Sequence, residues 1–185
     1  MHVFRVFFFS CAVILFGISA VCEMSAKAQQ STPPLSALPR GDFQFTGNWT
    51  CEGAFGNGKL HKSTYTGAVI LGGKWLELTE QDVLPSSGYL AKYLIGWDAQ
   101  QKRLVEFDAN NFSAATYSSD SGWSGNVLTM TSAVTQDARA PYAANRFVYS
   151  ITDPETFTVD WQISRSATLN WITSDHLACR RIPKA

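Results

Sequence analysis

The sequence predicts an all-β fold, an antiparallel up-and-down barrel of about eight to ten strands. Three observations lead to this prediction. Short segments of alternating apolar and polar residues fill the chain from residue 42 onward. No segment shows the three-to-four-residue apolar repeat of an amphipathic helix. Two cysteines stand near the two ends of the alternating region, where a bond between them would close the sheet.

The predicted strands are separated by connectors rich in Gly, Pro, Asn, Asp and Ser, such as 56–58 and 153–154. These connectors are short, so consecutive strands are expected to pair antiparallel. The one long connection, 138–145, holds either a single helical turn or an open loop. The predicted strands are 43–55, 63–71, 74–84, 88–98, 103–109, 112–119, 127–135, 146–152, 156–165 and 169–181.

Residues 1–28 have the pattern of a secretory signal peptide. A short charged start precedes an uncharged run over 6–21, and small residues stand at the −3 and −1 positions of a cleavage site after about Ala28. The alternatives are an uncleaved anchor, although the run is shorter than the roughly 20 residues a spanning helix needs, and lipid attachment at Cys22, although Val21 stands where a small residue is usual. We expect a periplasmic or secreted protein with no membrane span after cleavage.

The three prolines and many small polar residues of 29–41 predict a flexible lead-in, and 42–185 form the predicted barrel domain. The 15 basic and 15 acidic residues balance to a net charge of zero, so a nucleic-acid partner is not expected. Only 16% of the residues are charged and 45% are hydrophobic, which excludes a disordered chain.

Cleavage of the leader leaves two of the four cysteines, Cys51 and Cys179. An even pair in an exported protein suggests one disulfide, and two separately buried thiols are the alternative. A bond between the first and last strands requires backbones within about 7 Å, so it favours a closed barrel over a sandwich. No CxxC or clustered histidine pattern is present, and a zinc site is not expected.

Large aromatic side chains dominate the faces that alternation assigns to the interior of the barrel. They either fill the core or line a lumen that holds one small ligand. The candidate lumen residues are Tyr65, Tyr89, Tyr93, Trp97, Tyr117, Met130, Tyr149 and Trp161.

The chain carries no nucleophile elbow, HExxH sequence or phosphate-binding glycine loop, and we assign no catalytic residue. Glu106 and Asp108 share one face of a strand, opposite Val105 and Phe107, and we interpret that face as the solvated exterior. We interpret Asp160, between Val159 and Trp161, in the same way, as a residue of the solvated exterior. Whether the protein is an enzyme stays open, and a non-enzymatic function is favoured.

The first predicted strand opens with GNWTCEG over 47–53, and the chain ends its last strand with CRR at 179–181. Together with GGKW, YLIGWDAQQKRLVEFDANNFS, GWSGNVLT and FTVDWQISR, these segments resemble a family of exported bacterial proteins of unknown function that are built as calycin-like barrels. The resemblance covers roughly 43–181. It implies the barrel fold, a paired Cys51 and Cys179, and structural roles for Gly47 and Gly53.

The G-x-W opening also resembles that of lipocalins, in which a basic residue near the last strand lies across the signature Trp at the closed end of the barrel. Arg180 or Arg181 is the matching residue for Trp49. Such a residue would act through a cation–π contact and hydrogen bonds to nearby carbonyl groups. A ligand would then enter at the opposite end.

Nitrobindin, a haem-binding ten-stranded barrel, shares the G-x-W opening and takes its iron ligand from a histidine on the last strands. His176 is the candidate at the matching place. Cys51 stands where nitrobindins carry glycine, and alternation with Leu177 and Cys179 places His176 on the outside unless a bulge intervenes. The preferred interpretation is a solvent-side histidine next to Asp175, with haem as an alternative. His61, in the predicted turn after the first strand, has a weaker claim.

These observations favour an exported barrel that binds a small hydrophobic or amphipathic molecule in its lumen and needs no cofactor. One alternative is a haem-binding protein that uses His176. Another is a non-catalytic envelope protein that has a filled barrel and binds another protein. The sequence identifies neither the ligand nor the oligomeric state.

Overall fold

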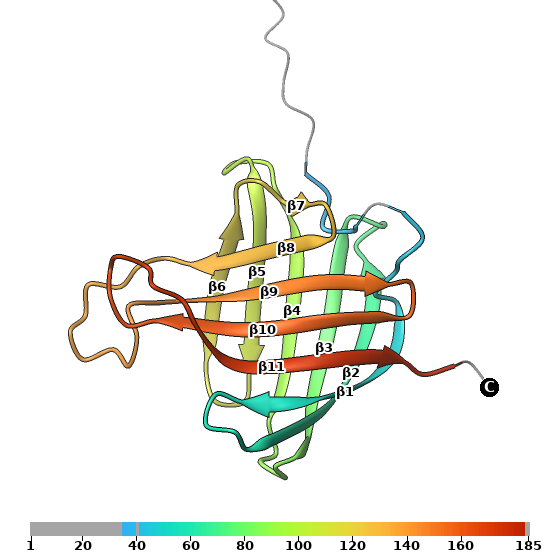
Figure 1. The fold of residues 1–185 in the computed structure, drawn as a ribbon. Coiled ribbons are helices and arrows are strands. Elements are labelled where there is room, and N and C mark those ends of the chain that lie inside the picture. The colour runs from blue at the N-terminus through green and yellow to red at the C-terminus, as the bar shows by residue number, and fades with distance from the viewer. Residues whose placement is uncertain (1–34, 40, 184–185) are drawn as a thin grey trace, which may run out of the picture. The chain divides into compact units, whose positions relative to one another are not determined.

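The fold of the chain is an antiparallel β-barrel, seen in a computed structural model that describes residues 35–39 and 41–183 (Figure 1). The predicted signal peptide, 1–28, lies outside the described residues. The described part contains eleven strands and no helix, and so no helix long and apolar enough to cross a membrane. The strands are β1 (Gly47–Phe55), β2 (Leu60–Ile70), β3 (Trp75–Leu84), β4 (Leu90–Asp98), β5 (Arg103–Asn110), β6 (Ala114–Ser119), β7 (Trp123–Ser124), β8 (Val127–Ser132), β9 (Ala144–Asp153), β10 (Thr156–Ser164) and β11 (Ile172–Arg181).

Ten of the strands form the barrel, and neighbours in the sequence are neighbours in the sheet. The first and last strands pair along Trp49–Arg181 to Phe55–Asp175, and β6 pairs with β8 to complete the closure. The two-residue β7 is an extra strand on β8. Figure 1 shows β8–β11 crossing in front of β3–β6. The predicted all-β, up-and-down barrel is therefore confirmed, since closure removes the unpaired edges of the sheet.

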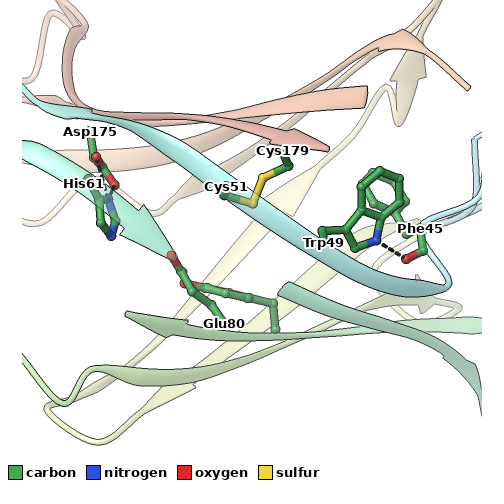
Figure 2. The surroundings of a disulfide bond; sticks show 8 residues. Phe45, Trp49, Cys51, His61, Glu80, Asp175 and Cys179 are labelled. Atoms are coloured by element: carbon green, nitrogen blue, oxygen red, sulfur yellow. Dashed lines mark hydrogen bonds and ion pairs between the residues drawn. A yellow bond between two sulfur atoms is a disulfide. The ribbon is translucent and has the colours of Figure 1, made fainter. Parts of the chain in front are cut away.

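The Cys51–Cys179 disulfide joins β1 to β11 (Figure 2). The two cysteines are direct partners in the strand register, their Cα atoms are 4.0 Å apart, and both side chains are buried. The bond spans 128 residues of sequence. It confirms the predicted pairing and is typical of proteins of oxidising compartments.

Trp49 and Arg181 close one end of the barrel. The fully buried Trp49 ring donates a hydrogen bond from Nε1 to the Phe45 carbonyl oxygen at 2.9 Å (Figure 2). The Arg181 guanidinium lies 4.1 Å from the centre of that ring and donates through Nη1 to the Thr46 carbonyl oxygen at 2.6 Å. Of the two arginines expected as candidates, Arg181 thus covers the ring, whereas Arg180 is exposed. We call this end the closed end.

Two glycines of the first strand are required by the backbone around them. Gly47 has φ of +112°, which residues with a side chain rarely adopt. Gly53 faces β11 so closely that a Cβ atom there would overlap the His176 carbonyl oxygen. Both positions therefore exclude a larger residue for structural reasons.

The described part of the predicted lead-in, 35–39, lies against the barrel. Ala37 is buried, and its carbonyl oxygen accepts a hydrogen bond from Trp123 Nε1 at 3.2 Å. Leu35 and Leu38 also pack against the core. The end of this segment is thus held on the barrel surface beside β7.

Candidate functional site: an aromatic and acidic cavity

A cavity of about 580 Å³ occupies the end of the barrel opposite Trp49 and Arg181. Strands β1, β3 and β5 run toward this end, so the connections 56–59, 85–89 and 111–113 surround it. We call it the lumen cavity. Its aromatic wall consists of Phe55, Tyr65, Tyr89, Tyr93, Phe112, Tyr117, Tyr142, Phe147 and Trp161, and its ionisable groups are His61, Glu80, Asp82, Asp108 and Asp175.

Some of the predicted lumen residues line this cavity and others do not. Trp97 lies near the closed end, opposite Leu104 in the β4–β5 register, and Met130 and Tyr149 are fully buried in the core away from the cavity. Alternation indicates which face of a strand points inward but carries no information on how far along the barrel axis a side chain lies. The predicted residues that line the cavity are Tyr65, Tyr89, Tyr93, Tyr117 and Trp161.

His61 lies inside the barrel, and the expectation that it stands in a turn was wrong. Strand β2 begins at Leu60, and His61, Ser63 and Tyr65 alternate inward as buried side chains. The imidazole stacks on Phe55 with ring centres 4.4 Å apart. The sequence signal was available, because the alternation of Ser63 and Tyr65 extends two residues upstream to His61.

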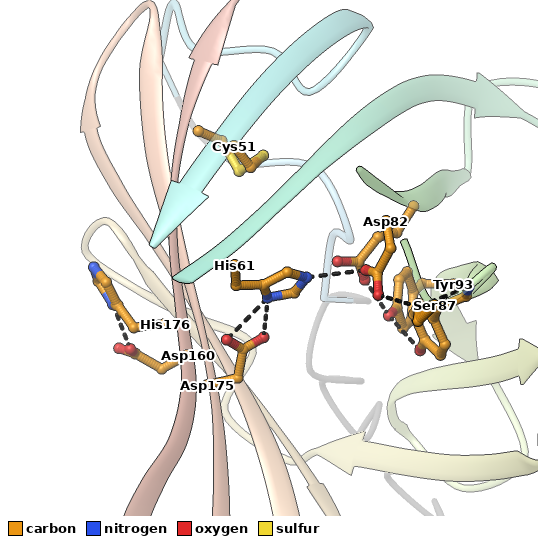
Figure 3. Close-up of polar contacts among 11 residues, drawn as sticks. Cys51, His61, Asp82, Ser87, Tyr93, Asp160, Asp175 and His176 are labelled. Atoms are coloured by element: carbon orange, nitrogen blue, oxygen red, sulfur yellow. Dashed lines mark hydrogen bonds and ion pairs between the residues drawn. A yellow bond between two sulfur atoms is a disulfide. The ribbon is translucent and has the colours of Figure 1, made fainter. Parts of the chain in front are cut away.

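Both nitrogens of His61 are held by carboxylates (Figure 3). Nδ1 donates to the Asp175 oxygens at 2.9 and 3.0 Å, and Nε2 donates to Asp82 Oδ1 at 2.9 Å. Burial alone would lower the pKa of His61, but the hydrogen bonds and charges of Asp175 and Asp82 outweigh it and raise the pKa to about 9. His61 is therefore an imidazolium at neutral pH, with no free lone pair for general base catalysis.

Hydroxyl groups hold the carboxylates around His61. Ser87 Oγ donates to Asp82 Oδ2 at 2.6 Å, and the Tyr93 hydroxyl donates to Glu80 Oε2 at 2.7 Å. Tyr93 and Asp82 appear together in Figure 3, beside His61. Burial raises the pKa of Glu80, although hydrogen bonds from Tyr93 and Tyr65 act in the opposite direction. His61, Asp82, Asp175 and Ser87 thus form one hydrogen-bonded group that joins β2, β3 and β11, and the Tyr93–Glu80 pair joins β3 to β4.

Glu106 and Asp108 point into the barrel, so their predicted outer position was wrong. Glu106 is fully buried and Asp108 is 6% exposed, whereas Phe107 between them is 47% exposed. Strand β5 has apolar residues on both faces, because Leu104 and Val105 are both buried. Its hydrophobic pattern therefore did not identify the inner face, which the sequence reading took from Val105 and Phe107.

Each of these two acids is held by one neighbour. Tyr149 donates to Glu106 Oε1 at 3.1 Å, and Asn110 Nδ2 donates to Asp108 Oδ1 at 3.1 Å. Burial raises the pKa of Glu106 to about 8 despite the Tyr149 hydrogen bond, and burial also raises the pKa of Asp108. Glu106 is accordingly protonated for the most part at neutral pH, and Asp108 faces the lumen cavity.

His176 lies on the outer face of β11 and does not line the cavity. Its Nδ1 atom is 2.6 Å from Asp160 Oδ1 on β10 (Figure 3). The solvent-side position expected for His176 agrees with the structure, whereas its neighbour in the sequence, Asp175, binds His61 inside the barrel. Asp160 has the outward position expected for it.

His61, Glu80 and Asp82 can each direct one ligand atom to a common point, since these atoms lie within 4.8 Å of one another. The group was not predicted, because His61 comes from β2 and the two carboxylates come from β3, and because the hydrophobic pattern of a strand does not show which charged residues are buried.

The chain was compared with models of known protein families, and none matches it. A search of curated proteins gave no match either. The fold is thus established by the structure, and the lumen cavity is the candidate functional site.

Proposed function

We propose that the protein binds a small amphipathic molecule, neutral or cationic, in the lumen cavity. The observation that carries this proposal is the cavity itself. Its volume of about 580 Å³ falls within the roughly 300–1,000 Å³ of small-molecule pockets, and both aromatic rings and ionisable groups line it. A ligand with an apolar body and a polar head would satisfy both surfaces.

The aromatic residues near the mouth support the apolar part of the ligand. Phe112 is 70% exposed and stacks on Tyr89 with ring centres 6.1 Å apart. Tyr142 meets Trp161 edge to face at 5.8 Å. Contact with an apolar ligand would remove such rings from water, which is favourable in proportion to the area covered.

The charges of the cavity support a neutral or cationic head group. Four carboxyl groups line it, and its described lining includes no Lys or Arg. The positive charge of His61 is already shared between Asp82 and Asp175. An anionic head group would therefore find no free counter-charge, whereas an ammonium group would be attracted by the carboxylates and the aromatic faces.

The same reasoning gives no support to haem bound through His176. That histidine lies on the outer face, and the two propionates of haem are anions.

We further propose that the protein is periplasmic or secreted after removal of residues 1–28, and that it belongs to the calycin-like family that its sequence resembles. The disulfide and the closed barrel support these two proposals.

Binding of the neutral fluorophore N-phenyl-1-naphthylamine tests the proposed function. We expect saturable binding that weakens about tenfold, or ~1.4 kcal/mol, when Trp161→Ala removes an aromatic wall. Trp97→Ala is the matched control, because Trp97 is half-buried but lies outside the cavity lining. Its affinity should stay within about twofold of the unmodified protein's.

Competition for the bound fluorophore tests the charge of the head group. Dodecylamine should displace it, whereas dodecanoate, with the same chain length and an anionic head, should not. The proposal is wrong if the unmodified protein does not bind the fluorophore, or if Trp161→Ala and Trp97→Ala change its affinity equally. Preferential displacement by dodecanoate would overturn the assigned head-group charge.

A further inference from the structure

We propose that His61, Glu80 and Asp82 bind a divalent transition-metal ion of the Zn²⁺ class, and that Asp175 is a positioning residue for this site. The proposal does not rest on the amphipathic ligand, because it concerns three side chains on one wall of the cavity. It is tested below with metal alone.

The strands place the three side chains on one inner wall. Glu80 and Asp82 are two residues apart on β3 and therefore share a face. In the β2–β3 register Glu80 lies opposite Tyr65 and Asp82 opposite Ser63, so both stand beside the inward row of β2 that begins with His61. Figure 2 shows Glu80 extending toward His61. Their ligand atoms lie within 4.8 Å of one another, a spread that small side-chain movements would reduce around one ion.

The partners of these side chains supply a second, independent observation. Asp175 holds His61 through Nδ1 with both oxygens at 2.9 and 3.0 Å, which leaves Nε2 directed at Asp82. Ser87 holds the other oxygen of Asp82 at 2.6 Å, and Tyr93 holds Glu80 at 2.7 Å. Metal-binding histidines and carboxylates in proteins are oriented in this way by partners on their non-ligating atoms.

The donor set indicates the class of ion. One imidazole nitrogen and two carboxylate oxygens suit Zn²⁺ and its neighbours, whereas Mg²⁺ and Ca²⁺ prefer oxygen ligands alone. Three protein ligands leave a fourth position, and this position would face the lumen cavity. His61 and Glu80 are buried, and the side chain of Asp82 is 7% exposed, so few water molecules compete with them.

Binding exchanges a proton for the metal ion. In the structure His61 Nε2 donates its proton to Asp82 Oδ1. On binding, the Nε2 lone pair would bond to the ion, and the proton would leave to solvent. Nδ1–H would stay on Asp175, so the ring would keep its orientation. The net charge added to the site is one positive unit, the divalent ion minus the released proton.

The test uses the untagged mature protein after chelator treatment, titrated with Zn²⁺ by calorimetry and with Co²⁺ by visible absorption. We expect one ion per chain with a micromolar or lower Kd. His61→Ala and Asp82→Asn should each weaken Zn²⁺ binding at least 100-fold. Asp175→Asn should weaken it roughly 10- to 100-fold while the Co²⁺ spectrum keeps its shape, because the ligands themselves are intact.

His176→Ala is the matched control, since His176 is also paired with an aspartate, Asp160, but on the outer face. It should bind Zn²⁺ as the unmodified protein does. We include Glu80→Gln as a variant that should still fold. The amide keeps the size of the side chain, and its oxygen can still accept the hydrogen bond from the Tyr93 hydroxyl. Zn²⁺ should raise the thermal midpoint of the unmodified protein and raise that of Glu80→Gln far less.

The proposal is overturned if the unmodified protein binds no stoichiometric Zn²⁺, or if Glu80→Gln and His61→Ala bind it undiminished. Equal affinity for Mg²⁺ would overturn the assigned class of ion. Failure here would leave fluorophore binding by the lumen cavity unaffected, so the two proposals are distinguishable.

Discussion

Glu106 is a fully buried carboxyl group whose Oε2 atom has no hydrogen-bond partner within the described chain. Asp108 on the same strand adds a like charge nearby and also favours the neutral form. The folded protein therefore keeps the Glu106 proton up to a pKa of about 8, whereas the unfolded chain releases it near 4.5. Between these values the folded state binds more protons, so this group lowers the free energy of unfolding as pH rises.

The pH dependence of stability tests this assignment. From pH 5 to pH 8.5 the unmodified protein should lose up to a few kcal/mol of unfolding free energy through Glu106, because one pKa unit is worth ~1.4 kcal/mol. Glu106→Gln should flatten the slope, since the amide keeps the Tyr149 contact and does not titrate. Urea unfolding at several pH values measures both. Identical slopes would contradict the assignment.

Among single residues, alternation was accurate for most apolar positions, with Phe107 an exception, and inaccurate for buried polar ones. Alternation correctly placed Trp49, Tyr93 and Cys51 inside. It placed Glu106 outside because hydrophobicity is the only signal that distinguishes the two faces of a strand. His61 depends on Asp175, 114 residues away in the sequence, and no local pattern shows such a partner.

At the scale of elements, the contact between β1 and β11 depends on Gly53. Gly53→Ala would drive its new Cβ into the His176 carbonyl oxygen, which belongs to the backbone and cannot rotate away. We expect a loss of about 1–3 kcal/mol or more in unfolding free energy, the usual effect of overpacking. Thermal or urea unfolding measures the loss.

Gly73→Ala is the comparison for Gly53→Ala. Gly73 has φ of +84° but no atom within 4 Å of its added Cβ, so this substitution reports backbone strain without overlap. Its effect should be about 1 kcal/mol. If Gly53→Ala lowers the unfolding free energy no more than Gly73→Ala does, the close approach of β1 and β11 at Gly53 is contradicted.

The elements themselves were largely predictable. Turn residues marked the strand boundaries, and the predicted strands correspond to those of the barrel, apart from shifts at their ends. The two-residue β7 was not predicted, because two residues show no alternation. The start of β2 was placed at Ser63 instead of Leu60, and this shift is the reason that His61 was assigned to a turn.

For the whole molecule, the Cys51–Cys179 bond ties the first strand to the last. Because it closes a loop of 128 residues, it restricts the unfolded chain strongly. In the loop-entropy account its removal costs up to about 4–5 kcal/mol. We expect the Cys51→Ala/Cys179→Ala double variant to unfold at a clearly lower urea concentration. A midpoint equal to that of the oxidised protein would contradict this expectation.

Reduction separates this effect from changes in packing. The oxidised protein should shift toward the midpoint of the double variant when a reductant is added, and the double variant should not respond. The fold should persist in both, because β1 and β11 also pair through their backbones from Trp49–Arg181 to Phe55–Asp175. Unfolding without denaturant would show instead that the bond is indispensable for closure.

The stacking of Trp49 under Arg181 occupies one end of the barrel, and the ionisable groups of the lumen cavity lie toward the other. Near the mouth Phe112 stacks on Tyr89 and Trp161 packs on Tyr142, whereas Trp49 contacts Phe43 and Phe157. Substitutions at sites that share no partners usually have additive effects. Residues near the mouth of the cavity can therefore be substituted without changing the packing of the closed end. The ligand specificity proposed for the lumen cavity should therefore respond to substitution of Phe112, Tyr142 or Trp161, while Trp49 and Arg181 maintain the closed end.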